Sequence, residues 1–261
     1  MNRWRLFSLF LGVNFIAMTL LTEPVLGQSS QPMWQEVMSD YVDASGRVNY
    51  DELRSNPFAL KSFVDFIAEV SPKSHPDLFA TENARKAYWI NAYNALVMWG
   101  IVENPGISSV KDVAIANGFF WRLKFVVGGE QMTLNQIEHD ILREKFRDSR
   151  IHFAINCGSA SCPVLGQRMY DADDLDARLD SAATHFISDT ANVRIDARKR
   201  TIYLSMIFNW YAADFEKSGL QGVIPTVIHY LPKEQKPMAD ISDFKIKYLD
   251  YNWDLNQQQT N

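Results

Sequence analysis

The sequence predicts a single α+β domain in which a central apolar helix packs on an antiparallel sheet. Three observations lead to this fold class. The segment 82–102 has helical spacing and is apolar nearly all round, which is typical of a central helix. Two glycines at 128–129 join short segments of alternating polarity into a hairpin. Further stretches with helical spacing alternate with turn residues along the rest of the 261-residue chain.

The first 27 residues have the pattern of a cleavable signal peptide. Arg3 and Arg5 precede an apolar stretch from Leu6 to Leu21, and Gly27 provides a small side chain at the cleavage position. A permanent anchor is the less favoured alternative, because this stretch is shorter than the roughly 18 residues that span a bilayer. We therefore expect a secreted or periplasmic protein of bacterial type that begins near Gln28, without a stable membrane span after cleavage.

Composition indicates one globular domain with an acidic surface. Residues 1–27 hold two arginines and one glutamate of the chain's 26 basic and 31 acidic residues, which leaves a mature formal charge of −6 (24 − 30). This charge argues against nucleic acid as a partner. We divide the mature chain into an N-terminal segment with the first helix (28–49), a globular domain (50–256) and a polar tail (257–261).

The first half of the mature chain is expected to be mainly helical. Apolar spacing predicts a short helix over Met33–Val42 and a longer helix over Tyr50–Val70. Ser45 and Gly46 form a turn between them, followed by an extended segment. Ser71–Pro76 ends the second helix, and the central helix follows over Glu82–Val102.

The second half mixes strands and helices. Thr133 and Gln136 form a capping box, which opens a helix to about Lys145 directly after the hairpin of Trp121–Val127 and Glu130–Met132. Ile151–Asn156 is expected to be a buried strand that leads directly into Cys157. The remaining expected elements are helices over Asp171–Ile187, Asn209–Phe215 and Val223–Leu231, and a strand pair within Val193–Phe208 that turns at Arg198–Arg200.

Five segments in this order resemble the family called domain of unknown function 547. They are YWINAYNAL (88–96), TLNQIEHDILR (133–143), RIHFAINCGSASCP (150–163), FNWYAADF (208–215) and YNWDLN (251–256). The resemblance covers about residues 50–256, and it departs at Asn252, where the family more usually has an aspartate. Since the family name assigns no activity, the chemistry has to be inferred from the residues.

Cys157 is the candidate nucleophile, because a thiol at the start of a glycine-serine loop can be exposed on a rigid backbone. His139 or His152 would lower the pKa of this thiol, and His139 is favoured because it lies at the edge of its helical stripe. Asn91, Asn94 or Asn156 would orient the imidazole. These residue types predict an exported thiol hydrolase or acyl transferase for an amide or peptide-like substrate, with a papain-like or transglutaminase-like architecture.

Three other interpretations of these residues remain open. Cys157 and Cys162 can close a disulfide across a short loop, as is common in exported proteins. The same cysteines with His139 and His152 can instead bind zinc; no other metal or cofactor is expected. Asn91 and Asn94 can serve only to satisfy buried backbone groups, because each amide on a buried helix needs hydrogen-bond partners.

The alternative function is a non-catalytic periplasmic binding or interaction module with a structural Cys157–Cys162 disulfide. Trp210, Tyr211 and Trp253 are then candidates for an aromatic groove that holds a peptide-like or amide-containing small molecule. Glu138 lies inside a helical stripe and is a further candidate for binding. Its more common role would be an ion pair with Arg143 or Arg150.

Overall fold

The computed structural model describes residues 31–113, 118–236 and 241–259, and within them the chain forms a mixed α+β domain that is mostly helical. The expected signal peptide (1–27) lies outside the described residues. The helices that are described include no segment long and apolar enough to cross a membrane.

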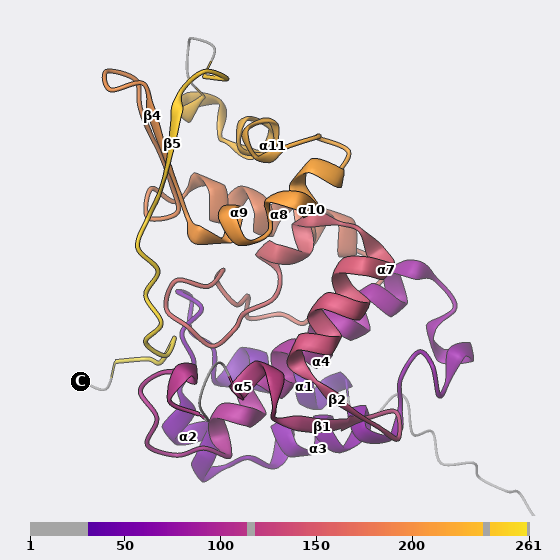
Figure 1. Cartoon of the computed structure of the whole chain (residues 1–261). Helices are drawn as coiled ribbons and strands as arrows, with labels where there is room; N and C mark the ends of the chain where they lie inside the picture. Colours follow the sequence, from indigo (N-terminus) through magenta and orange to yellow (C-terminus); the bar gives the residue numbers. More distant parts are fainter. Residues whose placement is uncertain (1–30, 114–117, 237–240, 260–261) are drawn as a thin grey trace, which may run out of the picture.

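One part of the domain is built by helices and one hairpin (Figure 1). Its elements are α1 (Gln31–Asp40), α2 (Tyr50–Ser55), α3 (Phe58–Glu69), η1 (Pro76–Phe79), α4 (Glu82–Val102), η2 (Val110–Asp112), α5 (Gly118–Trp121), β1 (Lys124–Val127) and β2 (Glu130–Thr133). A continuous helical run of α6 (Leu134–Gln136), η3 (Ile137–Arg143) and α7 (Glu144–Phe146), followed by η4 (Ser149–Phe153), leads to the other part.

The other part combines helices with a small mixed sheet. It contains α8 (Leu175–Ser188), β3 (Val193–Asp196), β4 (Thr201–Leu204), α9 (Met206–Trp210), α10 (Ala212–Lys217), α11 (Val223–Tyr230), η5 (Lys233–Gln235) and β5 (Lys245–Tyr248). β4 pairs antiparallel with β3 and parallel with β5. The parallel pair was not predicted, because β5 is exposed along its whole length and its partner lies about 40 residues earlier in the chain.

The central helix is confirmed over Glu82–Val102, but its expected packing on an antiparallel sheet is wrong. α4 packs mainly against other helices, especially α3, η3 and α2. Its side chains are buried on all sides, from Lys86 to Met98 without interruption. A single sheet covers only one side of a helix, so a helix that is apolar all round needs several neighbours. The strands instead form two small sheets in separate parts of the domain.

Local signals correctly predicted the hairpin and the capping box. Gly128 and Gly129 both have positive φ at the turn between β1 and β2, a conformation that glycine adopts without strain. Thr133 and Gln136 satisfy each other's backbone N–H groups. The segment predicted as one helix over Tyr50–Val70 is two helices, since Pro57 interrupts it after Asn56.

The strand predicted over Ile151–Asn156 is wrong. Residues 149–153 form a 3₁₀ helix, which Asp148 caps by accepting a hydrogen bond from the backbone N–H of Arg150. The segment is buried as expected, but a short apolar run is compatible with any buried conformation. Here the Asp148 cap and the neighbouring helix α8 determine the conformation.

Two hydrophobic clusters form the interior. The larger one surrounds α4, and the smaller one lies among α8, the mixed sheet and α9–α11. In the smaller cluster the rings of Phe153 and Phe208 contact each other and both contact Phe186 and Phe215. After β5 the chain returns to the first part (Figure 1). There the backbone N–H of Leu255 donates to Ser108, and that of Asn256 donates to Gly158.

Two asparagines on α4 hold other segments in place. Asn91 accepts hydrogen bonds from the indole N–H of Trp34 and the backbone N–H of Tyr170, and donates to the Tyr170 carbonyl. Asn94 donates to the Ala154 carbonyl at 3.0 Å and accepts from the backbone N–H of Asn156 at 2.8 Å. Both amides therefore meet backbone groups that would otherwise be buried without partners.

Replacing Asn94 with leucine is expected to destabilise the domain. The substitution leaves the Ala154 carbonyl and the Asn156 N–H buried without partners, so the free energy of unfolding should fall by about 1–3 kcal/mol. Urea titration followed by circular dichroism measures the change. Asn56→Leu, at an exposed position between α2 and α3, is the control and should change stability by less than about 0.5 kcal/mol. Equal stability of both variants would contradict the assigned role of Asn94.

Candidate functional site

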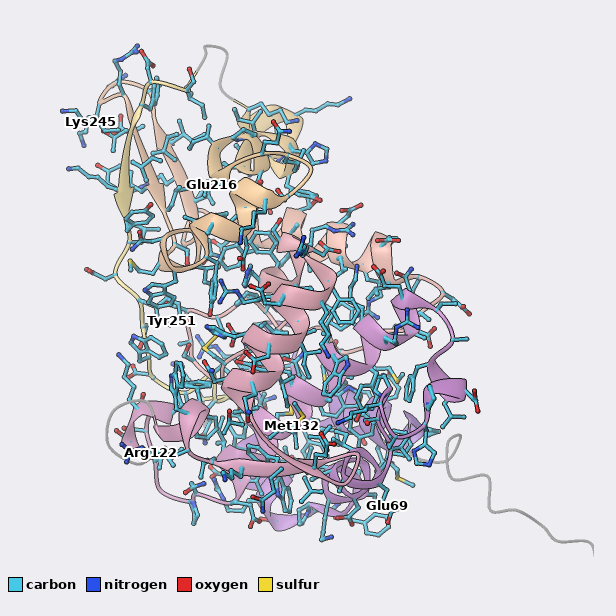
Figure 2. All side chains as sticks on the ribbon, turned by 45° about the vertical axis from the view of Figure 1, so that its right-hand side comes forward. Glu69, Arg122, Met132, Glu216, Lys245 and Tyr251 are labelled. Atoms are coloured by element: carbon cyan, nitrogen blue, oxygen red, sulfur yellow. A yellow bond between two sulfur atoms is a disulfide. The ribbon has the colours of Figure 1, made fainter. Side chains whose placement is uncertain are left out.

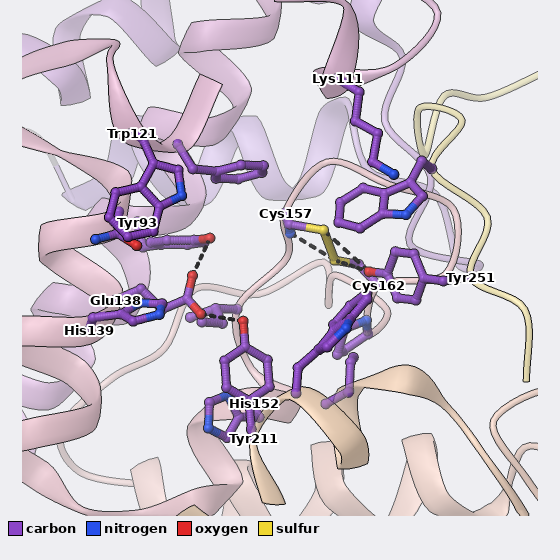
Figure 3. Close-up of a pocket in the computed structure, with 17 residues that line it drawn as sticks. Tyr93, Lys111, Trp121, Glu138, His139, His152, Cys157, Cys162, Tyr211 and Tyr251 are labelled. Atoms are coloured by element: carbon purple, nitrogen blue, oxygen red, sulfur yellow. Dashed lines mark hydrogen bonds between the residues drawn. A yellow bond between two sulfur atoms is a disulfide. The ribbon is translucent and has the colours of Figure 1, made fainter. Parts of the chain in front are cut away.

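A cavity of about 340 Å³ lies between the two hydrophobic clusters (Figure 3). Side chains of α4 and η3 line one side of it, and side chains of α9 and of the loop after η4 line others. Seven of its 17 lining residues are aromatic, namely Tyr93, Phe120, Trp121, Trp210, Tyr211, Tyr251 and Trp253. A concave cavity lined by apolar and aromatic side chains with a few polar groups is the usual form of a small-molecule site.

Both residues of the Cys157–Cys162 disulfide line this cavity. The expected disulfide is thus present, with a Cα–Cα distance of 6.2 Å, and it uses the chain's only two cysteines. The hydroxyl group of Tyr251 lies 3.3 Å from the sulfur of Cys157 and 3.1 Å from that of Cys162. It also accepts a hydrogen bond from Ser159 at 2.9 Å.

Residues 157–162, which we call the cysteine loop, are held from two directions. Asn156 donates to the Pro163 carbonyl and accepts from the backbone N–H of Gly158, which spans the loop from its base. From outside, Ala160 donates to the Asp254 carbonyl. Gly158 has a φ of +82°, and a side chain there would collide with Ile101 of α4. The loop therefore presents its disulfide to the cavity from a fixed backbone.

Glu138 is a buried carboxylate at the opposite side of the cavity, with 7% of its surface exposed. The hydroxyl of Tyr93 donates to one carboxylate oxygen at 2.9 Å, and the hydroxyl of Tyr211 donates to the other at 2.5 Å. Burial is the main reason why the pKa of both tyrosines lies well above the usual value, and the charge of Glu138 raises it further. The two hydroxyls therefore keep their protons.

The expected ion pair of Glu138 with Arg143 or Arg150 is wrong. Arg143 binds Asp214 through two N–H groups, and Arg150 forms ion pairs with Asp148 and two aspartates of α8. Glu138 lies instead within η3, a π-helical segment, and faces the tyrosines of α4 and of the α9–α10 junction. Short π-helical segments occur frequently at functional sites.

His152 lines the cavity and also belongs to a network with Asp214. Its Nε2 atom lies 2.8 Å from a carboxylate oxygen of Asp214, and its ring stacks on Tyr211 with centroids 3.9 Å apart. Burial alone would raise the pKa of Asp214, but hydrogen bonds and charge from His152 and Arg143 hold that pKa well below its usual value. Because an ionised carboxylate only accepts hydrogen bonds, Nε2 of His152 carries a proton.

His139 lines the cavity beside Trp121, with the two rings tilted and their centroids 6.3 Å apart. The Nδ1 atoms of His139 and His152 are both buried without a hydrogen-bond partner. Within the described residues, no hydrogen bond joins either ring to Cys157, and the asparagines Asn91 and Asn94 bind the groups given above rather than an imidazole.

A cluster of aromatic side chains covers the cavity at the cysteine loop. The rings of Trp210, Tyr211 and Trp253 all line the cavity, and Trp210 lies 4.8 Å from Tyr251 and 5.6 Å from Trp253, measured between ring centroids. The ammonium group of Lys111 lies over the Trp253 ring, 4.0 Å from its centroid. This arrangement places one positive charge at the edge of the aromatic wall.

The zinc alternative is not supported by this geometry. Both sulfur atoms are bonded to each other, so neither Cys157 nor Cys162 provides a thiolate ligand. Over the described ranges, no group of three or more histidine, cysteine or acidic side chains is placed to hold a metal ion.

Comparison with known families identifies part of the chain. Residues 78–187 match the family described as "Protein of unknown function, DUF547". The chain carries a DUF547 domain. Three of the five quoted motifs (88–96, 133–143 and 150–163) lie inside the match. No significant match was found among curated proteins or among solved structures.

The DUF547 match provides only part of the cavity. Tyr93, Glu138 and the cysteine loop lie inside it, whereas α9 and the C-terminal aromatics lie beyond residue 187. The motifs 208–215 and 251–256 supply those outer residues, so the resemblance there remains a prediction. The complete cavity requires both the matched region and the segments that follow it.

Sequence reasoning missed Asp214, and it assigned no role to Tyr93 or Lys111. Tyr93 lies between Asn91 and Asn94 on a buried helix, where a hydroxyl group needs a partner, so its role could have been inferred from the helix alone. Asp214 and Lys111 gave no such signal. Asp214 meets His152 across 62 residues of sequence, and Lys111 lies in a short 3₁₀ turn with no repeating pattern.

Replacing Asp214 with asparagine is expected to destabilise the protein in a pH-dependent manner. Removing one partner of the Asp214–Arg143–His152 cluster should lower the free energy of unfolding by roughly 2–3 kcal/mol at neutral pH. The pKa of Asp214 is lower in the folded than in the unfolded protein, where it is near 3.8. The stabilisation is therefore present above that value and is lost as pH falls toward the lower folded value.

Urea unfolding of both proteins at neutral pH and at about pH 3 checks this expectation, since the difference between them should shrink in acid. Asp65→Asn, which removes an exposed Lys61–Asp65 pair, is the control and should cost less than about 1 kcal/mol. A difference between the parent and Asp214→Asn that stays constant with pH would show that the Asp214 charge does not stabilise the fold.

Proposed function

We propose that this chain is a binding module that holds a peptide-like or amide-containing small molecule in the cavity. The observation that carries the proposal is the aromatic wall around a small set of convergent polar groups, with Glu138 and His139 on one side and Lys111 on the other. Aromatic rings provide large apolar contact area and can pack on flat amide groups. The carboxylate and imidazole supply hydrogen bonds that fix orientation.

The Cys157–Cys162 disulfide supports this function by fixing one wall of the cavity. A rigid wall lowers the entropy lost on binding, since the loop need not be ordered when the ligand enters. The disulfide also supports the proposal that the protein is exported to a periplasmic or extracellular location, because disulfides persist in oxidising compartments. In this proposal the cysteines are structural and the ligand leaves unchanged.

Replacing Trp210 with alanine tests the proposed binding. Trp210 lines the cavity, and its removal should weaken binding by about tenfold or more, because tryptophan side chains are often among the strongest contributors to binding. Isothermal titration calorimetry with the capped dipeptide N-acetyl-phenylalanyl-alanine amide and with the free dipeptide provides the measurement. Phe58→Ala is the control, because Phe58 is an aromatic residue 68% exposed on α3.

Two results would contradict this function. The first is that neither dipeptide gives saturable heat at millimolar concentration with the unchanged protein. The second is equal affinity of Trp210→Ala and Phe58→Ala for the dipeptides, which would place the binding surface outside the cavity.

A second candidate is a thiol-dependent hydrolase or acyl transferase for an amide or peptide-like substrate. The observation that favours it is the position of both cysteines in the wall of the cavity. Reduction of the disulfide would release Cys157 as a nucleophile, with His139 or His152 as the base and a papain-like or transglutaminase-like arrangement of the site. Such an enzyme would need the loop or a histidine side chain to move, since neither imidazole bonds Cys157 here.

Thiol chemistry is distinguished from binding by the two cysteine variants. A nucleophilic Cys157 predicts that amide cleavage of a peptide p-nitroanilide begins only after addition of a reductant. It also predicts loss of that activity in Cys157→Ser and its retention in Cys162→Ser. The binding module predicts no cleavage in any of these samples.

Alkylation of the reduced protein with iodoacetamide, measured against pH, provides an independent readout. The thiol candidate predicts slower reaction of Cys157 in either His139→Ala or His152→Ala, because one imidazole lowers the pKa of the thiol. Unchanged profiles in both histidine variants, together with absent cleavage, would remove this candidate.

A further inference from the structure

Glu138 brings a negative charge into the cavity without a direct positive partner. Its exposed fraction is 7%, and among the residues that the structure describes its two oxygens accept hydrogen bonds only from the neutral hydroxyls of Tyr93 and Tyr211. Among the described ion pairs none includes Glu138. A buried carboxylate is costly unless an opposite charge or several hydrogen bonds compensate it. The two hydroxyls compensate part of this cost and leave the charge itself unpaired.

The guanidinium of Arg143, which the Glu138 charge affects electrostatically, does not take the place of that partner. The two N–H donors of Arg143 that face Asp214 bind it at 2.6 and 3.1 Å. Its guanidinium lies over the ring of Tyr211, 5.0 Å from the centroid, while the hydroxyl of the same tyrosine binds Glu138. Arg143 therefore contributes charge only at longer range, and the side of Glu138 that faces the cavity stays open to a cation.

The opposite end of the cavity carries the complementary charge. Figure 3 shows Lys111 and Glu138 on opposite sides of the cavity, with the disulfide and aromatic rings between them. Lys111 is exposed and contacts the face of Trp253, and none of the ion pairs found in the described part of the chain involves it. The cavity thus has a negative end, a positive end and an apolar middle.

We infer that the ligand is a zwitterion, an amino acid or short peptide whose free ammonium group pairs with Glu138 and whose free carboxylate pairs with Lys111. This inference rests on the proposed binding function and specifies its ligand class. The ammonium group gains a charge-assisted hydrogen bond from Glu138 and contact with the surrounding tyrosine and tryptophan rings. The carboxylate gains the Lys111 charge at the cavity edge, where part of its hydration is retained.

Four forms of one dipeptide test this assignment by calorimetry on the unchanged protein. They are phenylalanyl-alanine, its N-acetyl derivative, its C-terminal amide, and the form capped at both ends. Because a hydrogen bond to a charged group is worth about 1.5–3 kcal/mol, loss of the ammonium group should weaken binding by about tenfold or more. Loss of the carboxylate should have a smaller effect, since Lys111 is exposed.

Two charge-removing variants assign each end of the ligand to its residue. Glu138→Gln should abolish the preference for the free ammonium group, and Lys111→Met should abolish the preference for the free carboxylate. Glu216→Gln and Lys245→Met are the matched controls, because both residues are exposed on α10 and β5 (Figure 2). The controls should keep both preferences. If Glu138→Gln does not fold, the four-probe series on the unchanged protein still decides the question.

The outcomes separate this inference from the function on which it rests. Equal affinity for all four probes would overturn the zwitterion assignment and leave the binding module in place. Binding of none of them would overturn both. A preference for the free ammonium group that survives in a folded Glu138→Gln protein would also overturn the assignment.

Discussion

The arrangement of the domain depends on the few polar groups of its central helix. α4 is buried on every side, so each polar side chain on it must find a partner within the protein. Asn91 binds the segment at Tyr170, Tyr93 binds Glu138, and Asn94 binds the backbone that leads into the cysteine loop. One helix therefore sets the positions of three segments that are far apart in sequence. Two of them, the carboxylate and the cysteine loop, form opposite walls of the cavity.

The second constraint is the way the cysteine loop joins the two hydrophobic clusters. η4 contributes Phe153 to the smaller cluster, and five residues later Gly158 packs against Ile101 of the larger one. The disulfide closes the loop between these contacts, and the returning C-terminal segment pairs with its outer edge. Since every wall is attached to a packed core, the cavity is formed before any ligand arrives. This preorganisation favours specific binding at low entropic cost.

Sequence patterns correctly predicted those elements whose conformation depends on residues close to them in the sequence. The central helix, the hairpin at Gly128 and Gly129, and the capping box at Thr133 all follow from local spacing and local hydrogen bonds. A cysteine pair five residues apart was compatible with a disulfide, a reactive thiol or a zinc site, and the structure contains the disulfide. The strand predicted at 151–156 failed because an apolar run indicates burial without specifying the backbone conformation.

The partners of the charged side chains were not predictable in the same way. Glu138 has an arginine five residues away in Arg143, yet its hydrogen bonds come from tyrosines 45 and 73 residues distant. Those contacts exist only after α4 and α9 have packed around η3. A charge inside an apolar stripe shows that a partner is needed, but the fold decides which one. The same limit applies to Asp214, whose two partners lie on separate elements.

The central claim is that Glu138 is the anchor of a preformed binding cavity whose cysteines remain oxidised. A crystal structure of the protein with phenylalanyl-alanine tests it most directly. We expect the dipeptide between the aromatic walls, with its ammonium nitrogen within hydrogen-bond distance of the Glu138 carboxylate and the Cys157–Cys162 disulfide intact. A dipeptide bound outside the cavity, or bound covalently to Cys157, would contradict this account.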